Sequence, residues 1–398
     1  VIKTILKIIG LGLMSLLLFF VILLRIDQKP YVDGEKIYAP IGEVAAVEPS
    51  PSPTPEVIPV VLTPKPSPTP TPSPTPEPEP EYFTLSFIGD CTLAPHQNTQ
   101  DYRTVMNGDY SYPFRNTAAI FKEDDLTIGN LECTLSGTTR WSAQQFYFQS
   151  PTDYAQILVE GSVEMVTTAN NHTDDFGSDA ISDTSAALDQ YGIAHAGNDS
   201  TTVIETESGL KVGMYSCTYS HITEQRILAG IENLKSQNVD LIVLALHWGQ
   251  ELIYEPTADQ ISLAHTAIDN GANIIYGSHP HCLGPVEEYN GGVIMYSMGN
   301  WSFGGSTNPS DPDTAIVQVS IKRDIDGAIT TEGFNAIPCC ISSRISDATS
   351  HVYGYNDYCP TPYEEGTEDY ARTMSKITGE FKGSGRGADY SNWYSSFG

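Results

Sequence analysis

From Tyr82 onward, short β-branched apolar runs alternate with longer stretches whose apolar residues recur at helical spacing. Two runs, 239–246 and 273–276, have the continuous apolar character of strands that are buried on both faces. This alternation predicts an α/β domain with a largely parallel sheet, and the strand-rich later part indicates a second sheet packed on the first. The expected strands are 83–88, 125–128, 163–167, 211–216, 239–246, 273–276, 293–296 and 315–321, and the expected helices are 179–191, 223–236 and 258–270.

The residues before Tyr82 follow a different pattern. Residues 4–25 are almost continuously apolar and about long enough to cross a hydrocarbon core of ~30 Å, so we expect a single-pass membrane span. Lys3 and Lys7, which precede the uninterrupted apolar run 8–24, favour a cytoplasmic N-terminus. A cleaved signal peptide is the alternative, although the apolar run is longer than usual for one. The rest of the chain would then lie outside the cytoplasm.

A tract rich in Pro, Ser, Thr and Glu follows over residues 48–81. Such a tract cannot build a core, and it is either a semi-rigid polyproline II stalk or a disordered linker. The expected organisation is an N-terminal membrane anchor over 1–25, an extracytoplasmic linker over 26–81, a folded domain over 82–338 and a partly irregular C-terminal extension over 339–398.

Several expected strands end at residues that can bind a metal ion or move a proton. In open α/β sheets, sites form outside the carboxyl ends of the strands. A single histidine at a strand end is more often a hydrogen-bonded loop residue, but polar groups at five strand ends together predict a metal centre. The residues are Asp90, Asn130, Glu132, Asn171, His172, His247, His279 and His281. Mixed carboxylate, amide and imidazole donors suit Mn, Fe or Zn, and they suffice for two ions, which is the arrangement of hydrolytic two-metal sites.

Six short motifs occur in an order that resembles the CapA/PgsA capsule-biosynthesis family. The resemblance runs from about Phe83 to Phe303. The motifs are Gly89-Asp90, Asn130-Leu131-Glu132, Ala169-Asn170-Asn171-His172, His247-Trp248-Gly249, Gly277-Ser278-His279-Pro280-His281 and Tyr296-Ser297-Met298-Gly299-Asn300. That family is associated with poly-γ-glutamate production. It is similar to the calcineurin-like metallophosphoesterases, which implies a four-layer α/β/β/α sandwich.

The resemblance also implies roles for individual residues. Five of them fall on metallophosphoesterase ligand positions, namely Asp90, Asn171, His247, His279 and His281. Glu132 resembles the bridging carboxylate, and His172 resembles the acid that protonates a leaving group. Asn130 and Asn300 are binding candidates, and Asn300 has the alternative of being a turn residue.

This sequence departs from the metallophosphoesterase pattern at two places. The usual Asp-x-His motif is replaced by Asp90-Cys91-Thr92, so one ion loses a ligand unless His96 or another group substitutes. The Asn-Leu-Glu motif stands where metallophosphoesterases have a Gly-Asp pair, a change shared with CapA-like proteins. The resemblance therefore supports a metal site better than it supports phosphatase activity.

The formal net charge is −29, from 49 acidic and 20 basic residues. This balance argues against nucleic-acid binding and against loose electrostatic capture of an anionic polymer. A polyanion would be admitted only where metal ions locally reverse the sign of the charge. The simpler explanation is that the acidity maintains solubility.

The seven cysteines are an odd number, so they cannot all pair within one chain. Cys91 and Cys133 each follow an expected metal-binding carboxylate, and they could form a disulfide or be two small buried residues. A second link, between Cys340 and Cys359, could staple the C-terminal extension.

Three functional hypotheses follow. The first is a membrane-tethered, metal-dependent hydrolase or transferase that acts on a cell-surface polymer such as poly-γ-glutamate. The second is a non-catalytic subunit of a polyglutamate synthesis and export complex. The third is a general surface metallophosphoesterase.

Overall fold

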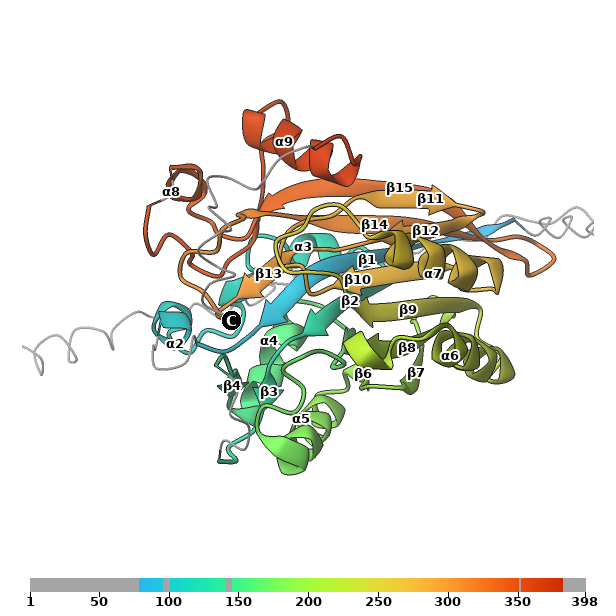
Figure 1. Cartoon of the computed structure of the whole chain (residues 1–398), viewed down its shortest axis with the longest axis horizontal. Helices are drawn as coiled ribbons and strands as arrows, with labels where there is room; N and C mark the ends of the chain where they lie inside the picture. Colours follow the sequence, from blue (N-terminus) through green and yellow to red (C-terminus); the bar gives the residue numbers. More distant parts are fainter. Residues whose placement is uncertain (1–78, 96–100, 140–144, 351, 382–398) are drawn as a thin grey trace, which may run out of the picture. The chain divides into compact units, whose positions relative to one another are not determined.

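The computed structural model describes residues 79–95, 101–139, 145–350 and 352–381. In this part of the chain, two β-sheets pack face to face, and helices cover the outer face of each sheet (Figure 1). The predicted mixed α/β fold, with a second sheet packed on the first, is therefore confirmed. The expected membrane anchor and nearly all of the Pro-rich tract lie outside the described residues. Within the described ranges, no helix is both long and apolar enough to cross a membrane.

The first sheet has the strand order β16-β15-β14-β1-β2-β5-β6, and β13 also pairs with β1. Strands β1, β2, β5 and β6 are parallel, whereas β14, β15 and β16 continue the sheet in antiparallel pairing. The bounds are β1 (Glu81–Thr92), β2 (Leu126–Leu131), β5 (Met165–Thr167), β6 (Ala194–Ala196), β13 (Asn300–Phe303), β14 (Asp313–Arg323), β15 (Ile329–Cys340) and β16 (Thr361–Pro362).

The second sheet has the order β11-β12-β10-β9-β8-β7, with parallel strands in the centre and an antiparallel strand at each edge. All residues of β9 are buried, which explains its unbroken apolar sequence. The bounds are β7 (Ser200–Glu205), β8 (Lys211–Thr218), β9 (Leu241–His247), β10 (Ile274–Ser278), β11 (Val286–Tyr289) and β12 (Gly292–Met295); β3 (Thr134–Leu135) and β4 (Gln149–Ser150) form a separate pair.

The three predicted helices correspond to α5 (Gly177–Gln190), α6 (Glu224–Ser236) and α7 (Ala258–Asp269). A capping box formed by Thr257 and Gln260 begins α7, because each side chain satisfies a backbone N–H that has no partner inside the helix. The remaining helices are α2 (Asp101–Met106), α3 (Ala118–Phe121), α4 (Ala155–Glu160), α8 (Ile345–Thr349) and α9 (Glu368–Ile377), with 3₁₀ turns η1 (Tyr112–Phe114), η2 (Thr152–Tyr154) and η3 (Tyr219–His221).

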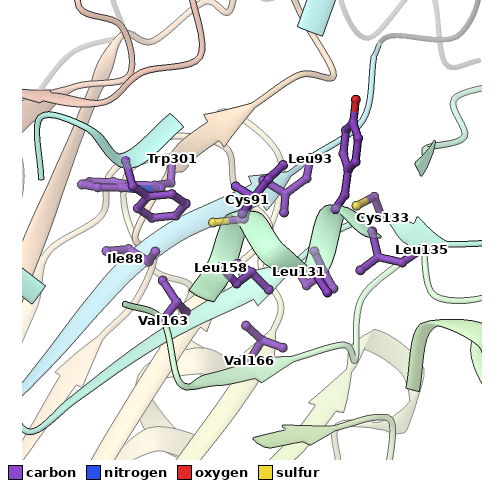
Figure 2. Packing of buried hydrophobic residues seen from close by; sticks show 14 of the residues in the cluster. Ile88, Cys91, Leu93, Leu131, Cys133, Leu135, Leu158, Val163, Val166 and Trp301 are labelled. Atoms are coloured by element: carbon purple, nitrogen blue, oxygen red, sulfur yellow. The ribbon is translucent and has the colours of Figure 1, made fainter. Parts of the chain in front are cut away.

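The apolar core has three main layers. Between the sheets, residues such as Phe87, Met214 and Tyr276 are fully buried, and the Tyr276 hydroxyl donates to the Ile88 carbonyl at 2.7 Å. Helices α6 and α7 pack on the outer face of the second sheet. Figure 2 shows the core on the outer face of the first sheet.

Cys91 and Cys133 belong to that outer core, beside Leu131, Leu158 and Trp301 (Figure 2). All seven cysteines are buried and free. Cys91 and Cys133 are therefore two small buried residues, as one of the two alternatives predicted. The disulfide alternatives, Cys91 with Cys133 and Cys340 with Cys359, are not formed.

The chain from Ile329 onward contains regular elements that the sequence pattern did not predict. Strand β15 pairs along most of β14 and ends at Cys340, and α9 packs against it. Ile377 of α9 contacts Leu283 and Ala315 in a small apolar cluster. The Lys376 ammonium is buried near it, with Nζ–O distances of 2.7 and 2.8 Å to Asp311 and 2.7 Å to Asp313. Helix α9 is therefore anchored to the sandwich by both apolar and ionic contacts.

Candidate metal centre

The carboxyl ends of the parallel strands in both sheets meet on one side of the molecule. Strands β1, β2 and β5 contribute from the first sheet, and β9 and β10 contribute from the second. The structure brings all the predicted site residues together in this region. Each one contacts another predicted residue or lines the same pocket as one. They are Asp90, Asn130, Glu132, Asn171, His172, His247, His279, His281 and Asn300.

One possible ligand group consists of Asp90, Glu132 and His281, whose donor atoms all lie within 4.8 Å of one another. His281 Nδ1 is 3.4 Å from Asp90 Oδ2, and its Nε2 is 3.7 Å from Glu132 Oε1. Both carboxylates are fully buried, and Glu132 Oε1 has no hydrogen-bond partner among the residues that the structure describes. A buried oxygen without a partner is costly, and a metal ion would satisfy it. The donor set therefore fits a divalent ion.

A second possible group consists of Glu251, His279 and His281, again with donor atoms within 4.8 Å of one another. The sequence analysis did not include Glu251. It follows the His247-Trp248-Gly249 motif after one intervening residue, and that proximity was the only signal available in the sequence. The two groups share His281, so they are adjacent parts of one centre.

His247 and Asn171 form a contact that joins the two sheets. The Asn171 Oδ1 atom lies 2.8 Å from His247 Nε2, and the Ser278 hydroxyl lies 2.9 Å from His247 Nδ1. The rings of His247 and His279 are 4.8 Å apart between centroids. The Tyr219 hydroxyl is hydrogen-bonded to the His279 ring, with 2.8 Å to Nδ1. These contacts fix imidazoles and an amide oxygen beside the carboxylates.

The two asparagine binding candidates orient other site residues. Asn130 Nδ2 donates to Asp90 Oδ1 at 2.9 Å, and Asn130 Oδ1 accepts from Asn170 Nδ2 at 3.0 Å. Asn300 Oδ1 lies 2.9 Å from His281 Nδ1, and its Nδ2 donates to the His281 carbonyl at 3.2 Å. The sequence did not single out Asn170, although it belongs to the same motif as Asn171.

Burial and close neighbours shift the pKa values of several ionisable groups in the centre. Burial raises the pKa of Glu132 well above its usual range, and the charge of Asp90 raises it further. Burial lowers the pKa values of His247 and His279, and the neighbouring His281 lowers both further. Burial alone would also lower the pKa of His281, but Glu132 and Asp90 outweigh it and raise that pKa to about 10. Because metal ligands must be deprotonated, a bound ion would replace these protons.

His172 lies at the edge of the centre and does not belong to either ligand group. Its Nδ1 is 2.9 Å from Asp175 Oδ2, and the ring packs edge-on against Phe148. His172 also lines a cavity of about 80 Å³ together with Glu251, His281 and Asn300. The cavity walls are largely apolar, including Phe148 and Phe303, and no lysine or arginine is among the described residues that line them.

Two features of the backbone allow the strand ends to approach one another. A Cβ atom at Gly89 would lie 2.3 Å from the Gly299 oxygen, and one at Gly277 would lie 2.2 Å from the Tyr296 oxygen. His279 and His281 have φ values of 100° and 54°, which non-glycine residues seldom adopt. Such conformations persist only where the surrounding structure enforces them, and they cluster at functional sites.

The fold and this centre define the protein as an α/β protein with a candidate divalent-metal site at the strand ends. The bacterial capsule synthesis protein PGA_cap family matches residues 84–304, and the chain belongs to that family. The predicted CapA/PgsA family is thereby confirmed.

Two similar proteins have names that refer to PGA or capsule biosynthesis. The PGA biosynthesis protein CapA of Bacillus subtilis (strain 168) is 26% identical over 271 residues, which cover 62% of this chain and 70% of that protein. The capsule biosynthesis protein CapA of Bacillus anthracis is 26% identical, covering 61% of this chain and 64% of its own length. Among solved structures, Haemophilus influenzae NAD nucleotidase (NadN) matches with a TM-score of 0.41 and 12% identity, covering 80% of this chain and 67% of that chain.

Proposed function

We propose that this chain is a membrane-tethered protein of capsule biosynthesis whose folded domain acts outside the cytoplasm. In this proposal it is a metal-dependent enzyme that hydrolyses or transfers a bond in a cell-surface polymer such as poly-γ-glutamate. Membership of the PGA_cap family and the names of the two Bacillus relatives support the process. The apolar segment 4–25 and the Pro-rich tract support the tether.

The observation that carries the enzymatic proposal is the group formed by Asp90, Glu132 and His281 around an unpartnered carboxylate oxygen. Most buried side-chain polar atoms have a hydrogen-bond partner, so an oxygen that has none among the described residues supports a bound ion at this position. Bound divalent ions would lower the pKa of a water molecule and stabilise the attacking and leaving oxygens. The order of helices and sheets supports a four-layer sandwich of the metallophosphoesterase type.

In the proposed centre, each residue has a distinct role. Asp90, Glu132 and His281 would hold one ion, and Asn171, His247 and His279 would contribute to a second. The ions would be Mn, Fe or Zn, which accept this mixture of oxygen and imidazole donors. His172 would donate a proton to a leaving group in the adjacent cavity, because it lines that cavity while Asp175 holds its Nδ1.

A non-catalytic role in a polyglutamate synthesis and export complex is the second candidate. One observation favours it. Strand β1 contributes only Asp90, because Cys91 lies in the apolar core and the Thr92 hydroxyl donates to the Glu132 backbone carbonyl at 3.3 Å. The expected substitute His96 lies outside the described residues. A metal centre with fewer ligands could support assembly of the complex without catalysing a reaction.

The proposed function is tested by metal analysis and by assay of the purified full-length chain. We expect Mn, Fe or Zn in stoichiometric amounts, and metal-dependent cleavage or transfer of γ-linked glutamate oligomers in preference to a simple phosphomonoester. Capsule production in cells should fall with His172→Ala. Capsule production that is unchanged in this variant, but lost when residues 1–25 are deleted, would favour the non-catalytic role.

A further inference from the structure

The position that supplies a histidine in the usual Asp-x-His motif provides no ligand in this chain. Thr92 occupies that position, its side chain is fully buried, and its hydroxyl is engaged with the Glu132 carbonyl. The preceding Cys91 points into the core of the first sheet, where Figure 2 shows it among apolar side chains. Any additional ligand must therefore come from another element.

Glu251 approaches the same centre from the second sheet. It lies on the loop after β9, and its carboxylate lies within 4.8 Å of a ring nitrogen of His279 and of His281. No hydrogen bond or ion pair joins this carboxylate to any residue of the described ranges. It is only partly exposed and lines the cavity beside His172.

Backbone contacts fix the Glu251 loop to the segment that carries the two histidines. The Leu252 N–H donates to the Pro280 carbonyl at 2.7 Å, and the Trp248 N–H donates to the Ser278 carbonyl at 3.1 Å. Leu252 has a φ of 61°, so the loop adopts a conformation that is unfavourable for leucine. Pro280 lies between His279 and His281, and these bonds therefore set the spacing of Glu251 to both imidazoles.

The local charge also favours bound cations. Three carboxylates, those of Asp90, Glu132 and Glu251, converge on the shared His281. Among the described residues, their ion pairs are only with histidines, and none is with a lysine or an arginine. Like charges at this spacing are unfavourable in a partly buried site unless an opposite charge lies between them. Two divalent ions would supply that charge.

We infer that Glu251 is a metal ligand. It supplies, from the side of the second sheet, the ligand that β1 does not provide. This inference rests on the proposed metal centre and extends it to a residue outside the six motif segments. Two histidines and one glutamate form a donor set of known catalytic zinc sites. The carboxylate on the β9–α7 loop completes such a set beside the Asp90 and Glu132 group.

The test is the Zn²⁺ affinity of the full-length chain, stripped of metal with a chelator and titrated with Zn²⁺ alone against a chromophoric competitor. We expect Glu251→Ala to weaken at least one binding step by about 10-fold or more, since even residues that only support ligands contribute 10–100-fold. Glu251→His, which supplies a different ligand atom, should restore part of the affinity. Glu255→Gln removes an exposed acid from the same loop and should have no effect.

The outcomes separate this inference from the proposed function. If the wild-type chain binds no Zn²⁺, Mn²⁺ or Fe²⁺, the metal centre itself is wrong. If the wild type binds Zn²⁺ and Glu251→Ala binds it with the same stoichiometry and affinity, only the assignment of Glu251 is wrong. Should Glu251→Ala fail to fold, Glu251→Gln preserves the shape of the side chain, and unchanged Zn²⁺ affinity in that variant would overturn the inference.

Discussion

The Nδ1 atom of His172 lies 2.9 Å from Oδ2 of Asp175, and the same oxygen accepts the Phe148 N–H at 2.9 Å. This carboxylate is fully buried, so it fixes the orientation of the imidazole from the protein side. The other ring nitrogen, Nε2, is then the one available to a group in the adjacent cavity. That arrangement is the one required of a general acid that does not coordinate a metal.

Replacement of His172 should therefore separate chemistry from metal binding. We expect His172→Ala to reduce turnover by roughly 10²–10⁴-fold, the usual range for a lost acid or base, while metal content and melting temperature stay near those of wild type. Asp175→Asn should reduce turnover less, because the imidazole remains. The control is His265→Ala, whose ring on α7 stacks on Tyr289 with 3.6 Å between ring centroids. Loss of metal in His172→Ala would show that His172 is a ligand.

The double variant His279→Ala with His281→Ala should lose most of its bound metal. His281 belongs to both possible ligand groups, and His279 belongs to the group that contains Glu251. Elemental analysis of the purified protein measures the change. A double variant at His195 and His265, which contact the exposed side chains of Asp189 and Glu287, is the matched control. Full metal occupancy after removal of His279 and His281 would contradict the proposed centre.

Helix α9 should depend on the buried ammonium of Lys376. Its Nζ lies 2.7 Å from both Asp311 and Asp313, which are themselves buried. Removal of one partner from a buried ion pair leaves an uncompensated charge, so Lys376→Ala should cost about 3–5 kcal/mol of unfolding free energy. Lys322→Ala disrupts a more exposed pair with Asp324 and should cost much less, because solvent screens that pair. Denaturant unfolding of both variants measures the difference, and equal costs would contradict it.

We expect the buried carboxyl group of Asp124 to make the folded protein less stable as the pH rises. Burial raises its pKa from the ordinary value to about 7, although hydrogen bonds from Ser86 and Thr127 oppose the shift. Between about pH 4 and pH 7 the folded state therefore binds more protons than the unfolded state, and stability decreases as pH increases. Asp124→Asn should melt at a higher temperature than wild type at pH 8 and at a similar temperature at pH 4. Glu123→Gln, at an exposed neighbour, should show no such dependence on pH.

Gly277 should tolerate no side chain. A Cβ atom there would lie 2.2 Å from the Tyr296 oxygen and 2.6 Å from the Met295 oxygen, so β10 and β12 would have to separate. Because β10 leads directly into His279 and His281, Gly277→Ala should lower both the melting temperature and the metal content. Gly137→Ala is the control, since a Cβ atom there meets nothing within 4 Å. Wild-type metal content and melting temperature in Gly277→Ala would contradict this account of the strand spacing.

The sequence predicted the strands that lead into the site and the polar residues at their ends, because burial on both faces produces continuous apolar runs that stop where a strand leaves the core. It did not predict β15, whose residues are mostly partly exposed and which contains Gly333 and Pro338. A strand that is half exposed carries little hydrophobic signal, because its fit depends on packing against its neighbours β14 and β16.

By itself, the sequence determined which side chains could bind a metal and in which order they occur. Only the tertiary structure decided that Asp90 from the first sheet meets His281 from the second, and that Glu251 joins them. It also decided that Cys91 and Cys133 are free thiols in the core. The physical reason is that local patterns report how one element is buried, whereas these contacts depend on how two sheets pack and on backbone bonds such as that from Leu252 to Pro280.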